Sequence, residues 1–283
     1  PVVLPSLILQ RAELFYRLAR FDESVASAEK FIEVDPHDSC GYNIRGLARV
    51  RLGKAKEALG DFDKALELLP DSAALYNNRA VAKMGLNLLE EAKADFDRSL
   101  LLNPKLVTAY KGRAEVNSNL ALSKEALEDL DKAIALDPFD ESLYADRTNV
   151  KTNIGLFEDA IKDADQGIHI NPTWNISYHN RGVAKNAMGK YTEAIRDFDT
   201  ALDLGERHFL TLMYRGSAKI GLGDRGSIES GIEDIREGIS LSPQRYARAY
   251  VSLGQAYELL LKESGFFRKF FLSQAAKSKY TTA

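Results

Sequence analysis

The sequence predicts an all-α fold made of repeated helix pairs, and two observations lead to this prediction. The first is a 34-residue period in two residue types, Pro36, Pro70, Pro104, Pro138 and Pro172 and Arg11, Arg45, Arg79, Arg113, Arg147, Arg181 and Arg215. The second is helical spacing of the apolar residues inside each period. A short amphipathic helix pair cannot bury its apolar stripes alone, so each pair needs neighbours. We therefore expect one solenoid domain rather than two globular domains.

The stretch from Tyr178 to Leu204 shows one period in full. Spacings of three and four favour a first helix that runs to about Met188 with one face formed by Tyr178, Arg181, Gly182 and Lys185. Gly189 can adopt the left-handed conformation that ends a helix. A second helix is expected from about Thr192, with an apolar stripe of Ala194, Ile195, Phe198, Ala201 and Leu202.

The order of residue types within a period resembles the tetratricopeptide repeat (TPR), a helix-turn-helix unit of the same length. In the second period the matching positions are Tyr42, Gly46, Gly53, Ala58, Phe62, Ala65 and Pro70. The resemblance covers roughly residues 5–262 and implies a right-handed superhelical solenoid. The expected repeats are 5–38, 39–72, 73–106, 107–140, 141–174, 175–208 and 209–245, with the first helix of an eighth at 246–262 and a capping helix at 263–283.

Two repeats depart from the pattern. Repeat 1 is degenerate, as terminal repeats often are, because one of its faces has no neighbour. Repeat 7 reaches Pro243 three residues late, and we place its extra residues in Asp224–Ser230, between its two helices. The letters GLGDRG at Gly221–Gly226 match a dinucleotide-binding pattern, but that pattern requires a preceding strand, so we interpret them as an interhelix loop.

Composition favours a soluble, cytoplasmic protein without a cofactor. The net charge of −3 gives no general attraction to nucleic acid or to an anionic membrane, and no apolar run is long enough to span a bilayer. The single cysteine, Cys40, fits a reducing compartment. The histidines lack metal-ligand spacing, and no catalytic constellation is recognisable, so neither a metal site nor an enzyme is expected.

The periodic arginines face periodic aspartates. In each repeat the first aspartate of a DFD-like pair borders the seam between helices, where an arginine can reach it in a bidentate contact. We interpret this set as a structural ladder formed by Arg45, Arg79, Arg113, Arg147, Arg181 and Arg215 with Asp61, Asp95, Asp129, Asp163 and Asp197. A basic stripe that binds an acidic peptide or nucleic acid is the alternative.

The family resemblance implies that the first helices line a concave, peptide-binding groove. The groove residues carried over to this chain are Asn43, Asn77, Asn78, Lys111, Asn149, Asn153, His179, Asn180 and Asn186. Asparagine is a weak helix former, and its amide both donates and accepts, which suits an extended peptide backbone. We expect these positions to be exposed. The family's clamp for a terminal carboxylate is rejected for the central repeats, because Glu115 and Asp146 would oppose the ligand.

The expected function is a non-catalytic scaffold for protein interactions, holding a peptide segment or a partner protein in the groove. Two alternatives stay open. One is a structural module that self-assembles into homo-oligomers, and the other is a regulatory TPR domain of a larger enzyme.

Overall fold

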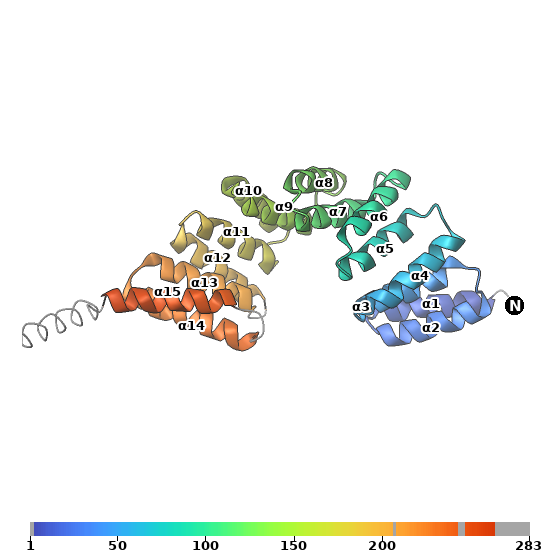
Figure 1. Ribbon diagram of the computed structural model, residues 1–283, viewed down its shortest axis with the longest axis horizontal. Coiled ribbons are helices and arrows are strands. Elements are labelled where there is room, and N and C mark those ends of the chain that lie inside the picture. Colours follow the sequence, from blue (N-terminus) through green and yellow to red (C-terminus); the bar gives the residue numbers. More distant parts are fainter. Residues whose placement is uncertain (1–2, 206–207, 243–246, 264–283) are drawn as a thin grey trace, which may run out of the picture. The chain divides into compact units, whose positions relative to one another are not determined.

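The computed structural model describes residues 3–205, 208–242 and 247–263. These residues form only α-helices, without a strand, as Figure 1 shows. The helices are α1 (Val3–Arg17), α2 (Phe21–Val34), α3 (Ser39–Arg51), α4 (Ala55–Leu68), α5 (Ala73–Gly85), α6 (Leu89–Leu102), α7 (Val107–Asn119), α8 (Ser123–Leu136), α9 (Glu141–Asn153), α10 (Phe157–Ile170), α11 (Asn175–Ala187), α12 (Tyr191–Leu204), α13 (Phe209–Leu222), α14 (Arg225–Leu241) and α15 (Ala247–Glu263). The all-α helical repeat fold is therefore confirmed. Pro243 and nearly all of the expected capping helix, 264–283, lie outside the described residues.

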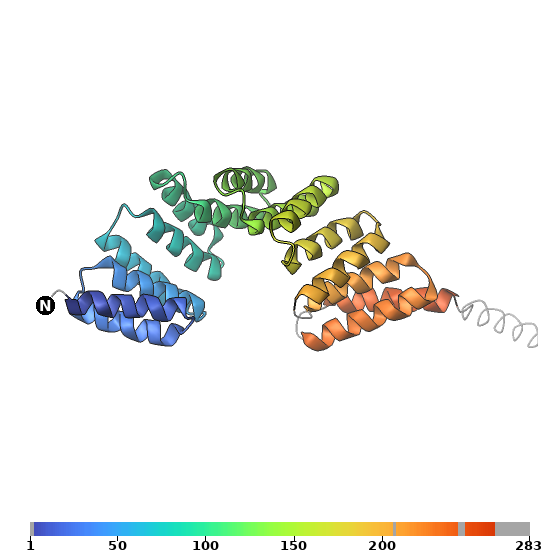
Figure 2. The same cartoon turned by 180° about the vertical axis from the view of Figure 1, so that it is seen from behind.

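The helices group into two units, Pro1–Phe139 with α1–α8 and Asp140–Ala283 with α9–α15. The sequence led us to expect a single solenoid domain. Within each unit, every odd-numbered helix except α15 packs on the even-numbered helix that follows it and on the next odd-numbered helix of the unit, as the two views in Figures 1 and 2 show. The odd-numbered helices, called the first helices below, thus form one layer in each unit.

In the core of a helix pair, a phenylalanine of the second helix packs against a glycine or another small residue of the first helix. Phe62, Phe96 and Phe198 are fully buried. A Cβ added to Gly182 would lie 2.7 Å from the ring of Phe198, and one added to Gly46 would lie 2.8 Å from Phe62. The small residue at the position of Gly46 and Gly182 therefore determines how closely the two helices of a pair approach each other.

The turn inside each pair contains one residue with positive φ, and these residues recur every 34 positions, at Ala19, Gly53, Asn87, Ala121, Gly155, Gly189 and Gly223. Glycine adopts this conformation without steric cost, whereas Ala19 and Ala121 adopt it at φ 56° and φ 59°. The first helix of each pair ends for this reason.

The second helices end at Asx turns followed by proline. The side chains of Asp35, Asn103, Asp137 and Asn171 each accept a hydrogen bond from the backbone N–H two residues later. Proline occupies the next position in each case, and it cannot continue the hydrogen bonding of a helix. A left-handed residue between the helices of each pair and, in four repeats, an Asx turn before proline thus mark the 34-residue period.

Repeat 7 differs from its expected form. Its extra residues do not lie in a loop, because α14 begins at Arg225 and has 17 residues, whereas α12 has 14. Gly223 ends α13 in the left-handed region, and the side chain of Asp224 accepts a hydrogen bond from the N–H of Ser227. Of the GLGDRG letters, interpreted from the sequence as an interhelix loop, only Gly223 and Asp224 lie between the two helices, and a helix rather than a strand precedes them.

Candidate functional site

The arginine–aspartate ladder is a set of buried ion pairs between the two helices of each repeat. In repeat 4, Nε and Nη2 of Arg113 donate to the two carboxylate oxygens of Asp129 at 2.9 and 2.6 Å. The same bidentate geometry joins Arg79 to Asp95, Arg147 to Asp163 and Arg181 to Asp197. Arg45 donates twice to one oxygen of Asp61. Asp61, Asp95, Asp129, Asp163 and Asp197 are at most 5% exposed.

Four of the ladder arginines also contact the preceding repeat. Nη1 of Arg79 donates to Asp63 at 2.8 Å, and Nη1 of Arg215 donates to Asp199 at 2.7 Å. Arg113 and Arg181 make the same contact with Asp97 and Asp165. One guanidinium therefore connects two successive repeats, with its buried partner in its own repeat and its half-exposed partner in the repeat before.

A second donor, four residues beyond the arginine, completes the coordination of the buried aspartate. Lys83, Lys151, Lys185 and Lys219 lie within 2.8 Å of Asp95, Asp163, Asp197 and Asp234, and Arg49 lies 2.7 Å from Asp61. In repeat 4 the donor is the amide of Asn117, at 3.1 Å from Asp129. A buried carboxylate with two or three donors is well satisfied.

The end repeats show how the ladder adapts. In repeat 7, Arg215 pairs with Asp234, which the sequence analysis missed. The signal was present, because the three added residues of that repeat shift the aspartate from the position 34 beyond Asp197. In repeat 1 the aspartate position holds Ser27, which accepts a hydrogen bond from Arg11 at 3.2 Å.

The pKa values of the ladder arginines show that these side chains stay charged. The hydrogen bonds that Arg113 donates to Asp129 and Asp97 raise its pKa against the opposing effect of burial. For Arg181 and Arg215 burial is the largest single influence and lowers the pKa, yet the hydrogen bonds that they donate to their aspartates raise it on balance. These guanidinium groups are saturated by carboxylates of the same chain.

The groove positions of the first unit form an amide cluster. Nδ2 of Asn78 donates to Oδ1 of Asn43 on the preceding first helix at 2.9 Å, and Asn77 donates to Asn78 at 3.3 Å. Oδ1 of Asn77 is buried and has no hydrogen-bond partner among the described residues. Lys111, on α7, is partly exposed.

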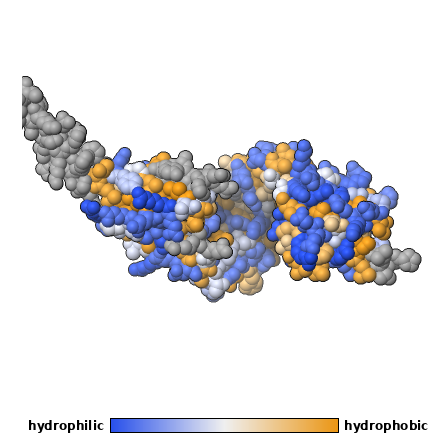
Figure 3. Space-filling view, turned by 90° about the horizontal axis from the view of Figure 1, so that it is seen from below, coloured by the Kyte–Doolittle hydropathy of each residue, from blue (hydrophilic) through white to orange (hydrophobic). Residues whose placement is uncertain are grey.

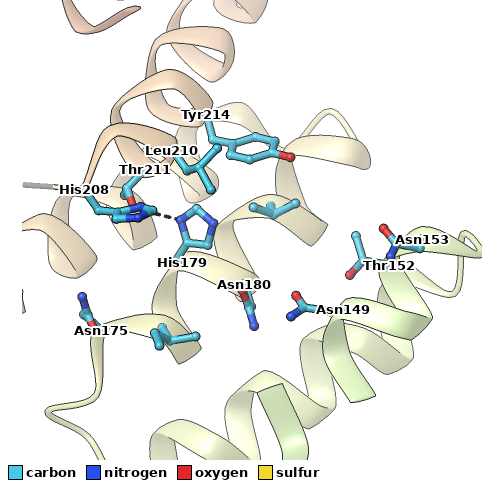
Figure 4. A pocket seen from close by; sticks show the side chains of 12 residues that line it. Asn149, Thr152, Asn153, Asn175, His179, Asn180, His208, Leu210, Thr211 and Tyr214 are labelled. Atoms are coloured by element: carbon cyan, nitrogen blue, oxygen red, sulfur yellow. Dashed lines mark hydrogen bonds between the residues drawn. The ribbon is translucent and has the colours of Figure 1, made fainter. Parts of the chain in front are cut away.

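The second unit contains a pocket of about 670 Å³ on its first helices, shown in Figure 4. Four of the expected groove residues meet there, Asn149 and Asn153 from α9 and His179 and Asn180 from α11. Val183 also lines the pocket, and the lining residues that the sequence did not indicate are Thr152, Asn175, Ile176, His208, Leu210, Thr211 and Tyr214. Asn186 does not line the pocket. Three successive first helices thus provide one mixed polar and apolar surface.

The amides of the pocket differ in their freedom to bind a ligand. Asn149 and Asn153 are exposed. Asn180, by contrast, is only 5% exposed, and its Nδ2 donates to the backbone oxygen of Ala145 at 3.3 Å. The expectation that Asn180 is an exposed groove residue is therefore wrong, because this amide connects α11 to α9. Oγ1 of Thr152 is buried without a hydrogen-bond partner among the described residues.

His179 is held at the floor of the pocket. Its Nδ1 lies 3.0 Å from Oγ1 of Thr211, and its ring contacts those of Phe198 and Tyr214. Burial lowers the pKa of His179 to about 4, and the charge of nearby His208 adds to this effect. At neutral pH the imidazole is therefore uncharged.

Among residues 3–205, 208–242 and 247–263, no helix combines the length and apolar character needed to cross a bilayer. The same residues contain no group of three or more His, Cys, Asp or Glu side chains able to hold a metal ion.

Comparison with protein families gives three matches. Two are models of the tetratricopeptide repeat, which match residues 9–73 and 176–209. The third is a model of the bacterial transcriptional activator domain, which matches residues 44–163. None of the curated proteins matches the chain.

Solved structures share the fold at low sequence identity. A tetratricopeptide repeat protein from Parabacteroides merdae is 19% identical with a TM-score of 0.69, and the match covers 89% of this chain and 98% of that one. A chain of the APC/C hetero-tetramer Cut9–Hcn1 is 18% identical with a TM-score of 0.68, covering 89% of this chain and 49% of that one, so this chain spans about half its length. YrrB, described as a TPR protein with an unusual peptide-binding site, is 23% identical with a TM-score of 0.52, covering 65% of this chain and 95% of that one.

The repeat matches, the helix pairs and these structural neighbours agree. The chain therefore contains tetratricopeptide repeats and has the fold of tetratricopeptide-repeat proteins.

Proposed function

We propose that this protein is a non-catalytic interaction scaffold that holds a segment of a partner protein in the pocket formed by α9, α11 and α13. The observation that supports this most is the convergence of exposed amides, hydroxyl groups and apolar side chains from three successive first helices on one cavity. Its volume of about 670 Å³ lies in the usual range of ligand sites, roughly 300–1,000 Å³. A cytoplasmic location remains part of this proposal, in line with the single Cys40.

The pocket does not favour catalysis. The contact between Thr211 and His179 has the geometry of a nucleophile next to a base. A general base works best when its pKa is near the operating pH, however, and the pKa of His179 is lowered to about 4. The imidazole would be a weak base at neutral pH, so this contact supports a positioning role for the histidine.

Selection from a random peptide library displayed on phage, followed by affinity measurement, tests the proposal. The pocket variant replaces both Asn149 and Asn153 by Ala, and both residues are exposed, so the fold should persist. The control is Asn119→Ala, because Asn119 is exposed and lies 34 residues before Asn153 but is outside the pocket.

Selected peptides should bind the pocket variant at least about tenfold more weakly, equivalent to ~1.4 kcal/mol, and the control should bind like the wild type. Failure to select any peptide, or equal affinity for both variants, would reject the pocket as the binding site. Light scattering of the free chain would reveal self-assembly as the competing explanation.

A second candidate function follows from the match of residues 44–163 to a bacterial transcriptional activator domain. In that case the repeats would be the regulatory part of a longer transcription regulator. The full reading frame tests this candidate: a DNA-binding domain encoded in the same frame supports it, and a frame that encodes repeats alone contradicts it.

A further inference from the structure

We infer that the pocket of α9, α11 and α13 selects an uncharged, internal peptide segment of about six residues that is anchored by an aliphatic side chain. This inference rests on the proposed function and specifies its ligand. It separates a segment within a chain from a chain terminus or an acidic or phosphorylated segment.

The first argument concerns the cations of the pocket helices. The basic side chains of α9, α11 and α13 are two per helix, Arg147, Lys151, Arg181, Lys185, Arg215 and Lys219. All of them are bound to buried aspartates of the second helices, at distances of 2.6 to 2.8 Å. Withdrawing one to bind a ligand would leave a carboxylate buried without its charge partner, which is costly. These helices therefore offer no spare cation for a terminal carboxylate or a phosphate.

The lining contains no carboxylate, ammonium or guanidinium group, because none of its residues is Asp, Glu, Lys or Arg. The lining includes two histidines, and His179 stays neutral because burial lowers its pKa to about 4. Its ring contacts Phe198 and Tyr214, and its Nδ1 lies against Thr211. A charged ligand group would lose hydration here without gaining a carboxylate, ammonium or guanidinium partner. We therefore expect a charge on the ligand to weaken binding.

The polar groups fit a peptide backbone. Asn149 and Asn153 lie one helical turn apart on α9, both exposed, and each amide can donate to a carbonyl and accept from an N–H. Between them, Oγ1 of Thr152 is buried with no hydrogen-bond partner among the described residues, although it lines the pocket. Figure 4 shows these three side chains together on one wall. The two exposed amides can therefore pair with C=O and N–H groups of a ligand backbone.

The opposite wall fits an aliphatic side chain. Ile176 and Leu210 are 43% and 36% exposed, although both are apolar, and Val183 also lines the pocket. Figure 3 shows hydrophobic residues only in patches among hydrophilic ones on the drawn face. Neighbouring helices are about 8–10 Å apart, so a strand that crosses from α9 to α13 spans roughly 20 Å, or about six residues. Alternate residues of such a strand would face the apolar wall.

Synthetic peptides of defined chemistry test the inference on the full chain. The probes are acetylated, fluorescein-labelled peptides of about ten residues, composed of Ser, Gly and Asn around a central Leu-x-Leu. Each is made with a C-terminal carboxamide, with a free carboxylate, with Asp or phosphoserine next to the anchor, and with the anchor leucines changed to Asn. Fluorescence anisotropy gives the affinity at about 50 and about 500 mM NaCl.

The carboxamide and carboxylate forms should bind within about twofold of each other, and the change in salt should alter affinity by less than about twofold. Charged neighbours or loss of the leucines should weaken binding by at least about tenfold. Tighter binding of the carboxylate or phosphoserine form would overturn the inference while leaving the proposed function intact. No binding of any form, together with no peptide from the library, would remove the proposed function as well.

A charge inserted into the pocket provides an internal check. Leu210→Lys should weaken binding of the uncharged probe and strengthen binding of the free-carboxylate probe by at least about fivefold. The reason is that the pocket lining offers no carboxylate to pair with the new ammonium group, so that the ligand's carboxylate can pair with it. The matched control is Leu204→Lys, since Leu204 is similarly exposed, at 40%, but lies on α12 outside the pocket. If Leu210→Lys and Leu204→Lys behave alike, the probes bind elsewhere and the inference is wrong.

Discussion

At the scale of residues, the ladder arginines are structural because each one holds a buried carboxylate. Arg113→Ala removes two donors from Asp129, which is 3% exposed, and should lower the free energy of unfolding by about 1–3 kcal/mol. Urea denaturation measures this change. Arg98→Ala is the control, because the pair of Arg98 with Asp71 is exposed and should contribute less than about 0.5 kcal/mol. Equal effects of the two substitutions would contradict the structural assignment.

A substitution at a left-handed turn residue should raise the free energy of unfolding, whereas Arg113→Ala should lower it. Ala121 adopts φ 59°, a conformation that costs a residue with a Cβ about 1–2 kcal/mol. Glycine relieves that cost but loses more entropy on folding, so Ala121→Gly should raise the free energy of unfolding by about 0.5–1 kcal/mol. Gly155→Ala, at φ 82° in the next repeat, should lower it. A lower midpoint of thermal unfolding for Ala121→Gly would show that the turn is not strained.

His179 should make stability depend on pH. Its pKa is about 4 in the folded chain and about 6.5 in an unfolded one, so below pH 6.5 the unfolded state binds the proton more readily. The stabilisation is complete above about pH 6.5 and is lost as the pH falls toward 4, on the order of 2 kcal/mol. His179→Gln can keep a hydrogen bond to Thr211 but cannot titrate. As the pH falls from 6.5 toward 4, the wild type should therefore lose unfolding free energy relative to the variant. A difference between the two proteins that does not change with pH would refute the assignment.

The sequence indicated much of this chemistry and missed part of it. The 34-residue period located the arginines and aspartates that the structure pairs, because charge and spacing are both visible in the letters. The burial of Asn180 was not visible. Its register on α11 matches that of an exposed groove residue, and only the packing of α11 on α9 places its amide against the carbonyl of Ala145.

At the scale of elements, turn chemistry explains why helix positions were predictable. Glycine, asparagine or alanine at the left-handed position and an Asx turn before proline mark both ends of a repeat. Repeat 7 shows the limit of this reasoning. The late Pro243 revealed three added residues but not where they lie, and the cap formed by Asp224 places them in the first turn of α14.

The last described helix leads to a prediction about the chain that follows it. Val251, Leu259 and Leu261 of α15 are 58%, 39% and 40% exposed. The sequence of 264–283 predicts an apolar stripe of Phe267, Phe270, Phe271 and Ala275 able to cover such a surface. Deletion of Phe266–Ala283 should therefore promote association, which light scattering detects. Binding of the intact chain to anionic vesicles, with unchanged behaviour after deletion, would instead indicate a membrane-binding segment.

At the scale of the whole molecule, the two units divide the polar groove positions between them. The first unit has the amide cluster of Asn43, Asn77 and Asn78, whereas the pocket lies entirely within the second unit. Sequence periodicity could not show this division, because all repeats share the same length and signals. The central claim is therefore specific: ligand contact belongs to the first helices of the second unit.

Hydrogen–deuterium exchange of the full chain, with and without a saturating selected peptide, tests that claim most directly. Protection should increase in α9, in α11 and in the segment from His208 to Tyr214, whose residues line the pocket. Exchange in α3, α5 and α7 of the first unit should not change. Protection of the first unit or of the second helices α10 and α12, with none in α9 and α11, would contradict the account.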